Sequence, residues 1–168
     1  MVTIIFEAHA TSIDNEAHRA SGHADVALSA LGEQQASQLG ARYALEIFDA
    51  IFCSDLRRSY RTAEIAFAAR KLPIIRDARL RECDYGQLTG QSAEEIESTK
   101  AHRITEPFPG GESYGQAAQR MKSFLEDLLK KYGGKKVLII GHRATQYGLE
   151  HWLNGVPLAT AVTALWHW

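Results

Sequence analysis

Val137-Leu138-Ile139-Ile140-Gly141-His142 is a β-branched, apolar run that ends in a glycine and a histidine. Val2-Thr3-Ile4-Ile5-Phe6 is a similar run near the start of the chain, and His9 follows it closely. Runs this short and apolar are typical of strands buried on both faces, as in parallel sheets. Between them the sequence alternates short apolar runs with amphipathic stretches. We therefore expect an α/β fold, with a mostly parallel central sheet between helical layers.

The other elements follow from periodicity and end signals. Ser29 can cap the start of a helix whose apolar positions recur at helical spacing. The clearest helix runs from Tyr114 to Tyr132 along a continuous apolar stripe, and Gly133-Gly134 ends it. We expect further strands at 50–53 and 73–76, further helices at 58–70 and 145–153, and an edge strand at 162–168.

The segment from about 84 to 111 is less regular. Turn signals occur at Tyr85-Gly86 and at Pro107-Phe108-Pro109-Gly110-Gly111. We predict a loop-rich flap with one short helix around 93–97. The whole chain, residues 1–168, is expected to form a single domain with this flap.

Composition excludes several classes of protein. Nineteen Lys and Arg residues against 20 Asp and Glu give a formal net charge of -1, which argues against electrostatic binding of nucleic acid. No apolar run approaches the roughly 20 residues that span a bilayer, and the first strand meets Glu7 too soon for a signal peptide. Cys53 and Cys83 are too few for a disulfide framework, so we expect a cytoplasmic protein. No local motif supports a reactive thiol, and we expect both to be small buried residues. Nothing in the sequence indicates a metal site or a cofactor.

Polar side chains follow three of the expected strands: His9, Ser54 and His142. The carboxyl ends of parallel strands line the ligand crevice of an open α/β sheet, so these side chains are expected to meet. Three arginines, Arg57, Arg58 and Arg61, follow the second strand. Histidines and arginine at a helix start suit an anion, and phosphate fits best. The alternatives are structural histidines and a solvated arginine face on the helix.

At these residues the sequence resembles the histidine phosphatase superfamily, the phosphoglycerate mutase-like group. Residues 7–16 resemble its Arg-His-Gly-Glu-Thr opening motif, and 54–63 resemble its Ser-x-Leu-x-Arg-x-x-x-Thr-Ala motif. Residues 80–86 resemble its Leu-x-Glu loop, 110–113 match a common Gly-Gly-Glu-Ser segment, and 139–142 resemble its second-histidine strand. The likeness covers nearly the whole chain and implies a phosphoglycerate mutase-like α/β/α fold.

The resemblance also implies roles. His9 would attack phosphorus and become phosphohistidine, and His142 would flank the transferring group. Arg58 would hold the phosphoryl oxygens. Glu82 would protonate the leaving oxygen. The remaining phosphate-side positions would be Asn15, Ser21 and Gly22. His18 and His23 lie in the same loop; we expect both to be exposed, and the alternative is that either meets the substrate.

Two departures bear on activity. The family has Arg before its nucleophile and Gly after it, whereas this chain has Ala8 and Ala10. An arginine in phosphoryl transfer is worth roughly 10³–10⁵ in rate, so its loss would impair catalysis. After His142 the family usually has Gly, but here the residue is Arg143. We hypothesise that the Arg143 guanidinium replaces the missing one; the alternative is that it points outward and pairs with an acid such as Glu7.

The sequence therefore predicts a metal-independent phosphomonoesterase that acts on a small phosphorylated metabolite through phospho-His9. The alternative is a catalytically impaired relative that binds phosphate or a phosphoprotein. A phosphoglycerate mutase is disfavoured because the chain is short. A homodimer remains open, and neither nucleic acid nor a membrane is an expected partner.

Overall fold

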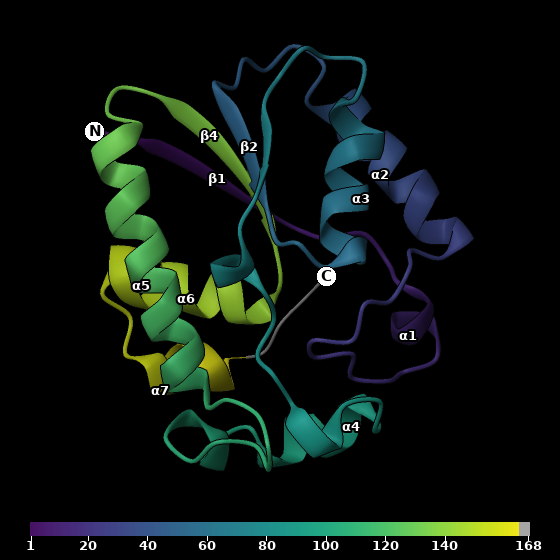
Figure 1. Ribbon diagram of the computed structural model, residues 1–168, viewed down its shortest axis with the longest axis vertical. Coiled ribbons are helices and arrows are strands. Elements are labelled where there is room, and N and C mark those ends of the chain that lie inside the picture. Colours follow the sequence, from purple (N-terminus) through teal and green to yellow (C-terminus); the bar gives the residue numbers. More distant parts are fainter. Residues whose placement is uncertain (165–168) are drawn as a thin grey trace.

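A computed structural model describes residues 1–164 of the chain, and a four-stranded parallel sheet lies at its centre (Figure 1). Strand order is β1-β4-β2-β3, so the strand nearest the C-terminus lies between the first two. Ile139 of β4 pairs with Phe6 on one side and with Phe52 on the other. The strands are β1 (Thr3–Ala8), β2 (Ala50–Cys53), β3 (Ile74–Arg76) and β4 (Lys136–Gly141).

Helices cover both faces of the sheet, as Figure 1 shows. Alternate residues of β4 point to opposite faces, because side chains alternate along a strand. Leu138 and Ile140 pack with Leu39 of α2 and Phe67 of α3, whereas Val137 and Ile139 pack with residues of α5 and α6. The expected three-layer α/β/α arrangement is confirmed.

The helix ends follow the capping signals in the sequence. Ser29 caps α2 by accepting the N–H of Gly32, and Ser113 forms a capping box with Gln116 at the start of α5. Gly155, in the left-handed region, ends α6. The α-helices are α1 (Ile13–Glu16), α2 (Ala30–Arg42), α3 (Arg57–Phe67), α4 (Ala93–Thr99), α5 (Tyr114–Lys131), α6 (Arg143–Asn154) and α7 (Leu158–Thr163). Short 3-10 helices cover Ala78–Leu80, Gly86–Leu88 and His102–Ile104.

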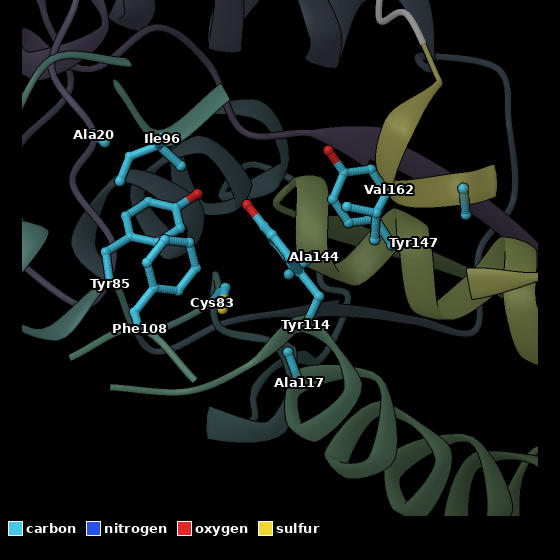
Figure 2. Packing of buried hydrophobic residues seen from close by; sticks show 11 residues of the cluster. Ala20, Cys83, Tyr85, Ile96, Phe108, Tyr114, Ala117, Ala144, Tyr147 and Val162 are labelled. Atoms are coloured by element: carbon cyan, nitrogen blue, oxygen red, sulfur yellow. The ribbon is translucent and has the colours of Figure 1, made fainter. Parts of the chain in front are cut away.

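The flap at 84–111 contains α4, close to the predicted short helix, and it packs through an aromatic cluster (Figure 2). Ring centroids of Tyr85 and Phe108 lie 5.0 Å apart, those of Phe108 and Tyr114 5.8 Å, and those of Tyr114 and Tyr147 5.6 Å, all in edge-to-face geometry. Edge-to-face pairs add to the stability gained by burying the rings. The cluster therefore fixes the flap against α5 and α6.

The expected edge strand at 162–168 is wrong where the structure describes it. Val162 and Thr163 belong to α7, whose N-cap is Pro157, and residues 165–168 lie outside the described part. Proline favours the first turn of a helix, a signal that outweighs the β-branched residues here. Cys53 and Cys83 are buried as expected, and burial raises the pKa of the Cys53 thiol to about 12. Within residues 1–164, no helix is long and apolar enough to cross a membrane.

Candidate active site

A cleft of about 850 Å³ opens at the carboxyl end of β1. Most of the predicted site residues line it, although they come from distant parts of the chain. They are His9, Asn15, Ser21, Gly22, Arg58, Glu82 and Arg143. His142 lies directly behind His9, with their ring centroids 4.9 Å apart.

His9 stands just beyond the end of β1 and is 8% exposed. Its Nδ1 lies 2.7 Å from the carbonyl oxygen of Ala10, which can only accept, so Nδ1 carries the proton and Nε2 keeps a lone pair. The N–H of Ala10 donates in turn to the hydroxyl of Thr62, which fixes this turn. Burial, and secondly the charge of Arg58, lower the pKa of His9 to about 3. The ring is therefore neutral at ordinary pH, as a nucleophilic imidazole must be.

His142 follows β4 and is fully enclosed at 1% exposed. Its Nε2 lies 2.6 Å from the hydroxyl of Ser54, so the polar groups that follow the three strands do meet. Burial, and then Arg58, hold the pKa of His142 well below its ordinary value. Its Nδ1 is buried, and the side chain forms a capping box with Thr145 at the start of α6.

Arg58 is a buried cation that lines the cleft. It lies in the first turn of α3, is 2% exposed, and donates to the carbonyls of Gly22 (2.8 Å) and Ala24 (2.9 Å). The three arginines after β2 separate in the structure. Arg57 is exposed, and the exposed Arg61 pairs with Glu64 at 2.7 Å. The solvated-face interpretation thus holds for Arg57 and Arg61.

The phosphate-side residues are ordered by their own hydrogen bonds. The oxygen Oδ1 of Asn15 accepts from the N–H and the hydroxyl of Ser12, both at 2.9 Å, which leaves its amide N–H groups as the donors toward the cleft. The hydroxyl of Ser21 donates to Asp14 at 3.0 Å. Gly22 has a φ of +48°, and a Cβ there would lie 3.1 Å from the backbone of Tyr85, so the tight turn requires glycine.

Glu82 is held at the start of α6. Its Oε1 accepts the N–H groups of Cys83 (2.8 Å) and Ala144 (3.1 Å), and its Oε2 accepts the N–H of Arg143 (3.2 Å). Helix N-termini favour anions because their first N–H groups lack partners within the helix. Oε2 accepts one of these bonds, whereas Oε1 accepts two.

Arg143 lines the cleft, but its guanidinium forms an ion pair with Glu97 of α4. The alternative was that Arg143 points outward and pairs with an acid such as Glu7. Glu7 instead pairs with Arg42 at 2.9 Å and accepts a hydrogen bond from the hydroxyl of Tyr43. The side chain therefore faces the cleft and reaches the flap, as a residue that could meet a substrate would.

Several lining residues were missed by sequence reasoning. Thr62 had a signal, because it lies four residues after Arg58 in a motif that was already singled out. The others lack a local signal, since their place depends on the folding of α1, α2 and the flap. They include Arg19, Gln35, Tyr85, Glu97 and Gln146. Among residues 1–164, no group of three His, Cys, Asp or Glu is arranged to hold a metal ion.

The two buried histidines thus meet at the ends of β1 and β4. Arg58 and Glu82 lie beside them, and the start of α6 holds Glu82. The model of the histidine phosphatase superfamily (branch 1) matches residues 4–164. The chain belongs to that superfamily. The chain is 32% identical to phosphoserine phosphatase 1 of Hydrogenobacter thermophilus, over 95% of this chain and 79% of the relative. It is 34% identical to a probable phosphoglycerate mutase, GpmB, of Erwinia tasmaniensis, over 94% and 77%.

Solved histidine phosphatase-like structures resemble the fold closely. Bacillus stearothermophilus YhfR superposes with a TM-score of 0.86 at 26% identity, covering 99% of this chain and 86% of that one. A mycobacterial glucosyl-3-phosphoglycerate phosphatase, solved with VO3, gives 0.83 at 26% identity, covering 93% and 83%. Named phosphatases occur among both the relatives and the neighbours, which supports a phosphatase.

Proposed function

We propose that the protein is a metal-independent phosphomonoesterase that forms a phosphohistidine on His9. One observation carries the proposal: a buried neutral His9, with its proton fixed on Nδ1, shares a cleft with Arg58 and Glu82. Neutral imidazole is a competent nucleophile, and covalent catalysis divides hydrolysis into two easier steps.

In the first step, the Nε2 lone pair of His9 attacks phosphorus and the ester P–O bond breaks. The leaving oxygen takes the proton from the Glu82 carboxyl. Arg58 and Asn15 donate to the phosphoryl oxygens, whose charge spreads over three positions in a loose transition state. His142 packs behind His9, with ring centroids 4.9 Å apart, and flanks the transferring group.

In the second step, water attacks the phosphohistidine and gives a proton back to Glu82 as the N–P bond breaks. His9 returns to its neutral form and inorganic phosphate leaves. No step needs an oxidant or a second substrate. The relatives include an enzyme named for phosphoserine and one named for glucosyl-3-phosphoglycerate, so we propose that the substrate is a small phosphate monoester with a polar leaving group.

The decisive experiment combines turnover with trapping. Wild type, His9→Asn and Glu82→Gln are incubated with ³²P-labelled phosphate ester and quenched in alkali, in which phosphohistidine survives. Wild type should turn over and His9→Asn should carry no label. With p-nitrophenyl phosphate as the substrate, Glu82→Gln should accumulate label on His9, because hydrolysis of the phosphohistidine then lacks its base. Full activity in His9→Asn would overturn the proposal.

The second proposal concerns Arg143, which we infer replaces the cation missing at Ala8. Arg143→Ala should lower kcat/KM by about 10²-fold or more, the cost of removing one transition-state donor. Ala8→Arg in the Arg143→Ala background should restore part of that loss, and Glu97→Gln should keep wild-type turnover. An unchanged kcat/KM in Arg143→Ala would show that its guanidinium serves only the flap.

One observation favours a catalytically impaired phosphate- or phosphoprotein-binding relative, namely alanine at position 8. Titration calorimetry with inorganic phosphate, run beside a panel of phosphate esters, separates the candidates. Phosphate binding that needs Arg58, without turnover of any ester, would favour the binding protein.

A further inference from the structure

His23 lies between the phosphate-side loop and the loop that carries Glu82. Its side chain is 25% exposed, and its Nε2 is 2.8 Å from the main-chain carbonyl oxygen of Glu82. A carbonyl oxygen can only accept, so Nε2 donates. The sequence predicts an exposed histidine in a loop, whereas in the structure its ring donates a hydrogen bond to the main chain of Glu82.

The turn that carries His23 is also the turn that Arg58 holds. The guanidinium of Arg58 donates to Gly22 and to Ala24, the residues on either side of His23. The backbone of this turn therefore accepts hydrogen bonds from Arg58, the proposed phosphate-binding cation. The central side chain, His23, donates to the main chain of Glu82, the proposed acid. A three-residue segment thus links the two groups.

Charged groups surround the imidazole from several elements. Nδ1 lies 3.6 Å from Asp84 Oδ2, and Nε2 lies 3.9 Å from Glu112 Oε2. Asp55 also interacts with the ring, and Arg120 donates both to Glu112 and, at 2.7 Å, to the same Glu82 carbonyl. Arg120 holds neighbouring carbonyls as well, which makes it the general support of the loop. His23 is the only one of these donors that comes from the phosphate side.

We propose that His23 is a positioning residue: it sets the Glu82 carboxyl against the leaving oxygen when Arg58 holds the phosphoryl group. The inference rests on the proposed role of Glu82 as proton donor. If it is right, loss of the Nε2 donor impairs protonation of the leaving group and leaves phosphate binding intact. That defect must depend on the leaving group.

The test compares His23→Met with His23→Gln, two side chains of similar length of which only glutamine can donate. Each is assayed on p-nitrophenyl phosphate, whose leaving group needs little protonation, and on an alkyl phosphate that the wild type hydrolyses. His23→Met should lose about 10-fold or more in kcat on the alkyl ester, within the range of general-acid effects, with little change on p-nitrophenyl phosphate. KM should be unchanged for both substrates, and His23→Gln should recover most of the loss.

Glu82→Gln is assayed in parallel, with His102→Leu, an exposed flap histidine, as the control. Thermal unfolding of every variant establishes that it is folded. Because Glu82 is also the proposed base of the second step, the variants are compared by the rate of the first step, measured as release of the leaving group in a single turnover. If Glu82→Gln slows that release equally for both substrates, the proposed acid is wrong. If Glu82→Gln slows it only for the alkyl ester while His23→Met resembles wild type or slows both equally, Arg120 suffices and the inference on His23 is overturned.

Discussion

Burial of a neutral His9 makes the stability of the fold depend on pH in a defined direction. The pKa of His9 falls from 6.5 to about 3 on folding, mainly through burial. The unfolded chain therefore binds a proton at His9 as pH falls through 6.5, while the folded protein does not until about 3. Because the unfolded state is the one that gains the proton, this contribution to stability is present above 6.5 and is lost as the solution becomes acidic.

The size of the effect follows from the two pKa values. At about pH 5, proton uptake by His9 in the unfolded chain amounts to about 2 kcal/mol, since one pKa unit corresponds to about 1.4 kcal/mol. His9→Asn removes that uptake. Asparagine can still donate to the Ala10 carbonyl, as the Nδ1 of His9 does, so the turn at the end of β1 is kept.

The assay is urea unfolding of wild type and His9→Asn at about pH 7.5 and about pH 5, followed by far-UV circular dichroism. Wild type should lose about 2 kcal/mol more than the variant between the two conditions, while all other titrating groups cancel in the difference. Equal losses in the two proteins would refute the argument, because they would mean that His9 titrates alike in the folded and the unfolded chain.

Three further predictions follow. Gly32→Ala should lower the free energy of unfolding by about 1–3 kcal/mol in urea titrations, because a Cβ there would lie 1.9 Å from the Thr11 carbonyl oxygen. Gly133→Ala, whose new Cβ would have no atom of residues 1–164 beyond its own chain neighbours within 4 Å, is the matched control and should stay near wild type. Arg58→Lys should lower kcat/KM by about 10²-fold, because an ammonium cannot hold two carbonyls and a phosphoryl group in one plane; steady-state kinetics on p-nitrophenyl phosphate would measure it. The acid limb of the kcat/KM profile should show no titration of His9 near 6.5, and a limb near 6.5 that also appears in the rate of phosphohistidine formation would contradict the pKa of about 3.

The local elements were predictable because their signals are local. The apolar stripe of α5 and the strand at β4 follow from periodicity, and Ser29 caps its helix as expected. The strand expected at 162–168 is wrong over its described part, because Val162 and Thr163 belong to the helix that begins after Pro157. Short apolar segments carry ambiguous periodicity, and there the end signals decide.

The sequence predicted which residues the fold brings to one cleft, but only some of their contacts. The meeting of His9 and His142 was expected from their places after two strands, and the pairing of β4 with β1 brings them together. The family motifs supplied Glu82 and Arg58. The motifs could not predict the contact of His23 with Glu82 or the ion pair of Arg143 with Glu97. Each of these contacts joins residues far apart in the chain, and no single motif contains both partners.

The start of α6 determines how the proposed phosphoryl group must be held. Its first amides would ordinarily form an anion site, but the Glu82 carboxylate already accepts the N–H groups of Arg143 and Ala144. Phosphate beside His9 therefore cannot rely on those two amides, and we expect Arg58 to meet much of its charge. The family arginine that is absent at Ala8 would have shared that charge. We propose that Arg143, whose own amide already donates to the acid, offsets this absence.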